Sequence, residues 1–305
     1  MELCTSIEKM REVRTTLTKS QKPVGFVPTM GALHDGHLQL IHTASQEAEV
    51  IVSIFVNPTQ FGIGEDLDRY PRDPEGDLEK CRQAGVKAVF MPSPGIMYPS
   101  DMQISFHVGR LNEQMCGASR PGHFEGVCQV VSKLFHIVEP DLAWFGQKDI
   151  QQYVILERMV RELNFPLDMR MVPTVRESDG LAMSSRNRYL TPEERVIAPL
   201  LYTALLQIRA ALTVKIVTTD SLSEVIQQQR DMLTQAGFQI DYLNVYRKET
   251  LHAILDVQEG QWNRFAEADY QSGDHQGNQL TLEGLLVAGA TWLGSTRLID
   301  NIVLS

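Results

Sequence analysis

Two patterns of hydrophobic and polar residues divide the chain near Arg188. In the first part, short β-branched or aromatic runs alternate with amphipathic stretches. This alternation is typical of a parallel sheet covered by helices on both faces, and so of the α/β class. The predicted strands are Val24–Pro28, Val50–Val56, Ala88–Met91, Leu142–Phe145 and Met169–Val175.

Two helices are predicted within this first part. Apolar residues between Val127 and Val138 recur at spacings of three and four, which places them on one face of a helix. The stretch Asp149–Asn164 has similar spacing. Both helices are therefore expected to pack on the sheet.

The pattern changes after Arg188. Thr191, Pro192 and Glu194 predict a helix start, because threonine caps a helix, proline suits its first turn and glutamate completes a capping box. The predicted elements are helices at Thr191–Leu212 and Ser221–Ala236, the latter ending at Gly237, and strands at Ile240–Tyr246, Leu285–Trp292 and Arg297–Leu304. We therefore expect one domain over residues 1–188 and a smaller α+β domain over residues 189–305. Residues 258–279 are polar with little periodicity, which predicts a surface loop, and they look like an insertion.

Composition and charge restrict the classes of partner that we expect this protein to bind. The chain has 305 residues, 43% hydrophobic and 22% charged, as in an ordinary globular protein. A formal net charge of -10 argues against a nucleic-acid partner held by a general basic surface. The four cysteines lack the spacing of a metal or redox site and are expected to be reduced, buried thiols. Met1–Arg14 carries charges throughout and lacks the apolar stretch of a signal peptide, and we expect no membrane-spanning segment, so the expected location is the cytoplasm.

The segment PTMGALHDGHLQLI follows a predicted strand and opens a predicted helix. Gly31 and Gly36 allow a tight turn. The helix N-terminus near His37 offers free N–H groups and a positive dipole end to a phosphate, and His34 would point toward the same anion. By itself this pattern fits two surface histidines at a strand-to-helix turn equally well.

A second motif favours the functional interpretation. GLAMSSRN, Gly180–Asn187, is a Gly- and Ser-containing loop that carries Arg186 after the last predicted strand of the first part. Adenylate-forming enzymes of the nucleotidyltransferase superfamily pair an HxGH turn after the first strand with a basic, Ser-rich loop after the last. MSSR resembles their KMSKS loop. Together the motifs predict an ATP site at the carboxyl ends of the strands.

Two further segments are expected at the same edge of the sheet. FVNPTQFGIGEDLDRYPRD follows the second predicted strand, and FGQKDIQQ follows the fourth. They offer neutral amides at Gln60 and Gln152, which can bind hydroxyl and carboxylate groups without a competing charge and so suit a small polyhydroxy acid. Lys148 offers a positive charge to phosphate oxygens, although an ion pair with Asp149 is an alternative use for it.

Five segments, in this order and spacing, closely resemble the pantothenate synthetase family: PTMGALHDGH, FVNPTQF, RPGHFEGV, FGQKD and MSSRN. The resemblance runs from about Lys22 to Asn187 and resumes at TRLIDNIVL. It implies a Rossmann-like, doubly wound N-terminal domain that holds ATP, a smaller C-terminal domain that acts as a lid, and a homodimer. It also implies that pantoate is activated by ATP, aided by Mg²⁺, as an acyl-adenylate that then reacts with β-alanine.

The resemblance also implies roles for particular residues. The family's ATP contacts fall on Met30, Gly31, His34, His37, Gly146, Gln147, Lys148, Asp149, Val175, Met183, Ser184, Ser185 and Arg186. Pantoate is expected between Gln60 and Gln152, with β-alanine near Gln60. Arg120 and His123 of RPGHFEGV are expected to close over the site. Gln147 replaces an acidic residue of the family's usual FGEKD, which we expect to alter local charge rather than the reaction.

The expected catalytic residues are His37, His34, Lys148 and Arg186, with His37 foremost, acting by stabilising charge on phosphate oxygens. Two alternatives stay open. An adenylyltransferase for a phosphorylated substrate should carry additional basic residues where this chain has amides, and a nucleotide-binding regulatory protein would not require the four catalytic residues together. The sequence assigns no ligands to Mg²⁺.

Overall fold

The chain folds into two compact units. A computed structural model describes residues 1–99, 102–213, 219–258, 261–264 and 282–304. The first unit comprises Met1–Asn112, Arg120–Arg176 and Met183–Ser185, and the second comprises Glu113–Ser119, Glu177–Ala182 and Arg186–Ser305. This division differs from a single boundary after residue 188, because two short segments from the first part of the chain pack with the second unit.

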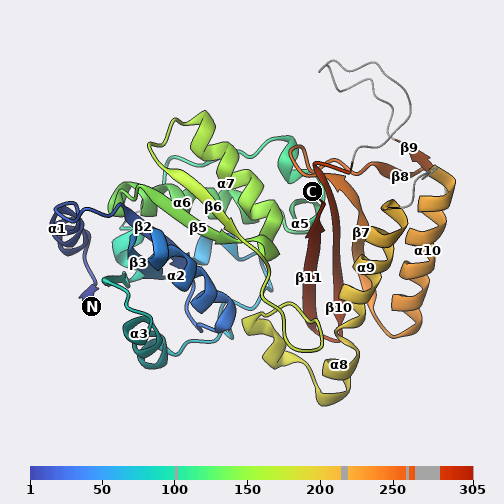
Figure 1. Cartoon of the computed structure of the whole chain (residues 1–305), viewed down its shortest axis with the longest axis horizontal. Helices are drawn as coiled ribbons and strands as arrows, with labels where there is room; N and C mark the ends of the chain where they lie inside the picture. Colours follow the sequence, from blue (N-terminus) through green and yellow to red (C-terminus); the bar gives the residue numbers. More distant parts are fainter. Residues whose placement is uncertain (100–101, 214–218, 259–260, 265–281, 305) are drawn as a thin grey trace. The chain divides into compact units, whose positions relative to one another are not determined.

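A six-stranded parallel sheet forms the centre of the first unit (Figure 1). In spatial order its strands are β1 (Glu2–Cys4), β4 (Ala88–Phe90), β3 (Glu49–Ile54), β2 (Val24–Thr29), β5 (Leu142–Gly146) and β6 (Asp168–Val172). The order reverses between β2 and β5. In doubly wound sheets of this kind, ligands bind at the carboxyl ends of the strands beside such a switch point. The predicted α/β fold is confirmed, and β1 is an addition too short to give a sequence pattern.

Helices cover both faces of this sheet (Figure 1). Side chains of a strand alternate between faces. Accordingly Val27 belongs to the core cluster that includes Ile41, whereas its neighbour Phe26 contacts Phe135 on the opposite face. The longer helices are α1 (Ile7–Leu17), α2 (Asp35–Glu47), α3 (Pro74–Gln83), α6 (His123–Val138) and α7 (Ile150–Glu162). The short helical turns are η1 (Pro58–Gln60), α4 (Pro94–Met97), η2 (Arg110–Asn112), η3 (Gln147–Asp149) and η4 (Ser185–Tyr189).

The second unit is built on an antiparallel sheet in the order β11-β10-β7. Its elements are α5 (Cys116–Ser119), α8 (Pro192–Ile197), α9 (Leu200–Leu212), α10 (Thr219–Gln235), β7 (Gln239–Arg247), β10 (Leu285–Leu293) and β11 (Thr296–Val303). The capping box of Thr191 and Glu194 is present, and Gly237 has a φ of +96°, as suits the residue that ends α10. The predicted helical stretch Thr191–Leu212 is present but divided into α8 and α9, because the chain breaks at Pro199, whose ring lacks an N–H donor.

One stretch of the second unit is apolar enough to need an explanation. By length and composition Pro192–Leu212 could cross a membrane, contrary to the expectation that no segment would meet this criterion. Its residues Leu201, Leu205 and Ile208 are buried in the hydrophobic core with β10. Packing inside the unit accounts for part of the apolar composition, since 33% of the most apolar window is buried.

A short hairpin occupies part of the predicted loop at 258–279. Strands β8 (Leu255–Gln258) and β9 (Gln261–Arg264) pair antiparallel. The expectation of a loop is therefore wrong for Gln261–Arg264. Residues 259–260 and 265–279, the rest of the predicted insertion, lie outside the described part of the chain.

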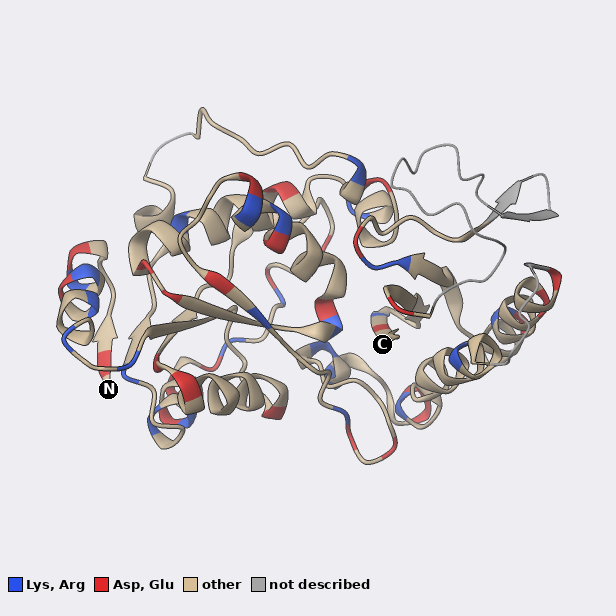
Figure 2. Ribbon diagram, turned by 45° about the horizontal axis from the view of Figure 1, so that its top comes forward, with Lys and Arg blue, Asp and Glu red and all other residues tan. Residues whose placement is uncertain are grey.

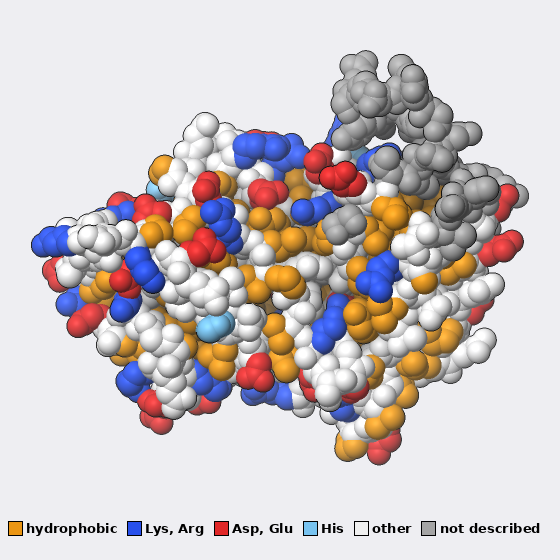
Figure 3. All heavy atoms as spheres, viewed as in Figure 1, with side chains coloured by type: hydrophobic (Ala, Val, Ile, Leu, Met, Phe, Trp, Pro, Cys, Tyr) orange, Lys and Arg blue, Asp and Glu red, His pale blue; other side chains and the backbone are white. Residues whose placement is uncertain are grey.

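The distribution of the charged residues and the state of the cysteines agree with the expectations from the composition. Acidic and basic residues are interspersed along the described elements of both units (Figure 2). They are also interspersed on the face that the space-filling view presents (Figure 3). All four cysteines are buried and free, as expected.

Candidate active site

The turn after β2 is held by a buried carboxylate. Gly31 has a φ of +83° and Ala32 a φ of +50°, a left-handed backbone that brings successive N–H groups to one side. Asp77 of α3 is 1% exposed and accepts from the N–H groups of Ala32 and Leu33, both at 2.7 Å. Lys80 donates to the carbonyl of Leu33 at 2.7 Å. Sequence reasoning missed α3 and with it these two residues, since neither belongs to a recognisable motif.

His34 and His37 cap the helix that follows. The N–H of Gly36 donates to Nδ1 of His34 at 3.1 Å, and the N–H of His34 donates to Nδ1 of His37 at 3.3 Å. A ring nitrogen that accepts carries no proton, so each neutral imidazole has its hydrogen on Nε2. The rings lie 4.0 Å apart between centroids. The cap thus leaves two neighbouring Nε2–H donors at the N-terminus of α2.

Both histidines are neutral at physiological pH. Burial, followed by the charge of Lys148, lowers the pKa of His34 to about 4. Burial, followed by His34 and Lys148, lowers the pKa of His37 to about 3. The pair can therefore donate to an anion without itself carrying charge, and Lys148 contributes more of the nearby positive charge than Lys80 does.

The turn after β5 supplies that charge. β5 pairs with β2, so the turn Gly146–Asp149 starts from the strand beside the one that ends at the histidines. Lys148 Nζ lies 3.2 Å from both carboxylate oxygens of Asp149, and the ion pair considered from the sequence is present. Gln152, on the first turn of α7, is half-buried.

Part of the Ser-rich loop also meets the histidine turn. The N–H of Met183 donates to the carbonyl of Val175 at 3.0 Å, and a Cβ on Gly36 would lie 3.9 Å from Met183 Cβ. Ser185 is buried, with its Oγ 3.4 Å from the Tyr70 hydroxyl. Ser184 lies between these two positions. Arg186 belongs to the second unit, and its part in the site stays a prediction.

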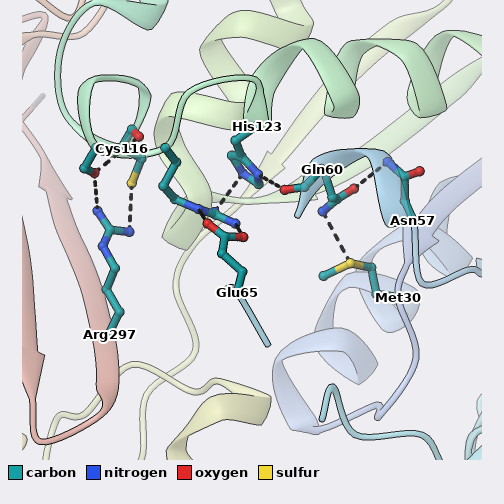
Figure 4. Close-up of polar contacts among 9 residues, drawn as sticks. Met30, Asn57, Gln60, Glu65, Cys116, His123 and Arg297 are labelled. Carbon is teal, nitrogen blue, oxygen red and sulfur yellow. Dashed lines mark hydrogen bonds and ion pairs between the residues drawn. The ribbon is translucent and has the colours of Figure 1, made fainter. Parts of the chain in front are cut away.

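Gln60 is a buried amide whose side chain is already oriented. Its Oε1 accepts from Nδ2 of Asn57 at 3.0 Å, and its Nε2 lies 3.3 Å from the sulfur of Met30 (Figure 4). Asn57 is 1% exposed and accepts from the Tyr98 hydroxyl at 2.7 Å. His123 contacts the backbone oxygen of Gln60 at 2.7 Å. Sequence reasoning missed Asn57, although an asparagine before a proline at the start of a short helix is a recognisable cap.

The arrangement combines neutral donors, the ammonium groups of Lys148 and Lys80, and amide side chains. Such a set suits a ligand with phosphate groups and a second ligand with hydroxyl or carboxylate groups. Within the described residues, no group of three or more His, Cys, Asp or Glu side chains could hold a metal ion.

Comparison with known proteins agrees with this geometry. Residues 2–303 match the family model of pantoate-beta-alanine ligase. The chain is 44% identical over 306 residues to a pantothenate synthetase of Pseudomonas putida, covering 98% of this chain and 97% of that protein. The pantothenate synthetase structure from Thermus thermophilus superposes with a TM-score of 0.83 at 40% identity, over 99% of each chain.

A third relative was crystallised with ligands. The pantoate-beta-alanine ligase of Francisella tularensis, solved with beta-gamma ATP and beta-alanine, matches with a TM-score of 0.76 at 30% identity, over 99% of this chain and 97% of that one. A family match across nearly the whole chain, relatives above 40% identity and the parallel sheet with its histidine cap lead to one conclusion. The chain belongs to the pantoate-beta-alanine ligase family.

Proposed function

We propose that this chain condenses pantoate with β-alanine at the expense of ATP, giving pantothenate, AMP and diphosphate. In the first step, the pantoate carboxylate attacks the α-phosphorus of ATP and diphosphate leaves. In the second, the amine of β-alanine attacks the carbonyl of the mixed anhydride, AMP leaves and the amine loses a proton. Membership of the family, the similarity to pantothenate synthetases and the relative solved with beta-gamma ATP and beta-alanine support this reaction.

The observation that carries the proposal is the histidine cap beside Lys148. Negative charge builds on the phosphate oxygens when diphosphate leaves. Preorganised donors aimed at that charge lower the barrier most, since they need no reorganisation during the reaction. Nε2–H of His37 and of His34 supply neutral donors, and Lys148 supplies a positive charge. In the proposal Arg186 joins them from the Ser-rich loop, and the remaining ATP contacts are those the resemblance implies.

Pantoate is proposed to bind between Gln60 and Gln152. Gln60 supports this assignment, since its buried carboxamide is oriented by Asn57. Replacing Gln60 or Gln152 by Ala should weaken the use of pantoate by about 1 to 3 kcal/mol, the cost of an unpaired polar partner in a buried site. ATP binding should hardly change. Titration of each variant with both ligands checks this, and an equal loss for pantoate and ATP would show that the site is misassigned.

Mg²⁺ is proposed to enter with ATP. Magnesium is commonly held by substrate phosphates, water and one or two carboxylates rather than by a protein cage. When bound, the ion neutralises phosphate charge and orients the phosphate chain.

The second unit is proposed to act as a lid, and the protein to work as a cytoplasmic homodimer. An acyl-adenylate hydrolyses when water reaches it, which gives a closing domain a chemical purpose. The acidic and basic residues interspersed along the described elements favour small partners over a polyanion (Figure 2).

The direct test is release of diphosphate from ATP with pantoate alone, with β-alanine alone and with both. We expect release with both at a sustained rate, at most one equivalent per site with pantoate alone, and none with β-alanine alone. Sustained release without pantoate, or none under any condition from a folded protein, would refute the proposed function.

A further inference from the structure

A chain of polar contacts connects Glu65 to the backbone of Gln60. Arg120 donates from Nε and Nη2 to the two carboxylate oxygens of Glu65, at 2.7 and 2.6 Å. Nη1 of Arg120 lies 3.0 Å from Nε2 of His123, and Nδ1 of His123 lies 2.7 Å from the backbone oxygen of Gln60. In Figure 4, His123 lies between Gln60 on one side and the side chains that lead to Glu65 on the other.

The chemistry of the side chains fixes which atom donates and which accepts in each of these hydrogen bonds. A guanidinium can only donate, so Nε2 of His123 must accept from Arg120. The neutral imidazole then carries its hydrogen on Nδ1, which donates to the carbonyl of Gln60. The pKa of His123 is lowered to about 4, chiefly by burial and then by Arg120, in agreement with a neutral ring. Arg120 thus sets the tautomer that binds Gln60.

The Arg120–Glu65 ion pair is more buried and more restricted in geometry than an exposed ion pair. The two side chains are only 18% and 26% exposed, and the contact is bidentate. Two parallel N–H to oxygen bonds restrict the guanidinium plane as well as its position. The pair therefore holds the ring of His123 from one side while Gln60 holds it from the other.

Helix α6 also controls the side chain of Gln60. Asn57, which donates to Oε1 of Gln60, donates in addition to the carbonyl of Gly126 in α6 at 3.2 Å. His123 is the first residue of the same helix. The backbone and the carboxamide of Gln60 are thus both tied to one rigid element.

We propose that Glu65, Arg120 and His123 are positioning residues for pantoate, acting through Gln60. They hold the η1 turn so that the carboxamide of Gln60 meets the substrate in one orientation. The proposal deepens the proposed function and rests on it, since it requires that Gln60 binds pantoate.

The first test compares three replacements of His123. Asparagine places an amide N–H near the position of Nδ1, whereas glutamine places it near Nε2 and alanine removes both. His123→Ala and His123→Gln should raise the KM for pantoate about three- to tenfold, the range of one neutral hydrogen bond. His123→Asn should stay within about twofold of the parent. The Kd for ATP and the melting temperature are measured for each, and equal effects of Asn and Ala on a folded protein would overturn the proposal.

The second test asks whether the effect passes through Gln60. In a Gln60→Ala background, His123→Ala and Glu65→Gln should add almost nothing to the KM for pantoate, because the group they position is gone. Fully additive effects would overturn the proposal. Glu65→Gln keeps the size of the side chain and serves where His123 variants fold poorly.

The results of these tests distinguish a failure of the positioning role from a failure of the proposed function. If Gln60→Ala alone leaves the KM for pantoate unchanged, the assignment of the pantoate site is wrong and the inference falls with it. If Gln60→Ala raises that KM while His123→Ala leaves it unchanged, the proposed function stands and the positioning role is refuted. A loss of ATP affinity as large as the loss for pantoate would indicate a merely structural role, and would also refute it.

Discussion

In the proposed reaction, His34 and His37 act as donors through Nε2, because backbone N–H groups already occupy their Nδ1 atoms. Each Nδ1 accepts from an N–H at the start of α2, which holds the ring and leaves Nε2–H for a ligand. Their low pKa values keep both rings neutral, so they add no repulsion to Lys148 before ATP arrives.

Replacing His37 by Ala removes one of these donors. We expect kcat to fall by about a hundredfold or more, because such donors matter most when charge develops. ATP binding should be less affected. His37→Gln, which keeps an N–H near the position of Nε2, is the matched control and should recover part of the rate. Steady-state kinetics decide the matter, and an unchanged kcat in folded His37→Ala would show that the cap is only structural.

The low pKa of His37 also predicts how stability depends on pH. In the unfolded chain a histidine titrates near 6.5, whereas in the folded protein the pKa of His37 is about 3. Between these values the unfolded state binds a proton that the folded state does not. The contribution is fully present above pH 6.5 and is lost as pH falls, by at most about 1.4 kcal/mol per pH unit.

Urea unfolding at pH 6 and pH 5 measures this dependence. The free energy of unfolding should fall more for the parent than for His37→Gln, whose side chain does not titrate. Equal losses in the two proteins would mean that His37 is not held neutral.

At the residue scale, the sequence predicted only those candidate site residues that belong to local motifs. His34, His37 and Gln60 stand in short patterns whose chemistry can be interpreted directly. Asp77 and Glu65 act through partners 45 and 55 positions away, and no periodicity reveals such pairs. Their roles depend on how α3 and the loop after η1 fold back.

At the level of elements, the packing of α6 on η1 depends on Gly126. A Cβ on Gly126 would lie 2.3 Å from the backbone oxygen of Thr59 and 2.8 Å from the N of Gln60. Because the obstacle is backbone, η1 and α6 can approach this closely only with glycine here.

Gly126→Ala should therefore displace the turn that carries Gln60. We expect a destabilisation of about 1 to 3 kcal/mol, typical of overpacking, together with a higher KM for pantoate. Gly95→Ala in α4 is the control, since a Cβ there meets nothing within 4 Å. Thermal unfolding and pantoate titration check both variants. A Gly126→Ala protein with the stability and KM of the parent would contradict this account of the packing.

The sequence predicted long, regular elements better than short or interrupted ones. The buried strands β2, β3 and β5 and the one-sided helix α6 follow from periodicity, because each buries a continuous apolar face. β1 has too few residues for a pattern, and the polar helix α3 shows little apolar periodicity.

At the scale of the whole molecule, the sequence predicts two domains, but it does not predict every segment that joins the second unit. Glu113–Ser119 joins the second unit through two residues. The sulfur of Cys116 lies 3.3 Å from Nη1 of Arg297 (Figure 4). The hydroxyl of Ser119 donates to Asp241 at 3.0 Å. These contacts join residues more than 120 positions apart. A boundary drawn from local composition cannot detect them.

The central claim is that pantoate is activated as an adenylate before β-alanine takes part. Exchange of labelled diphosphate into ATP tests it most directly, since exchange requires that the first step run backwards without the second. With ATP, Mg²⁺ and pantoate, the account predicts exchange in the absence of β-alanine, and none when β-alanine is the only other substrate. Exchange that required β-alanine would contradict a separate adenylate.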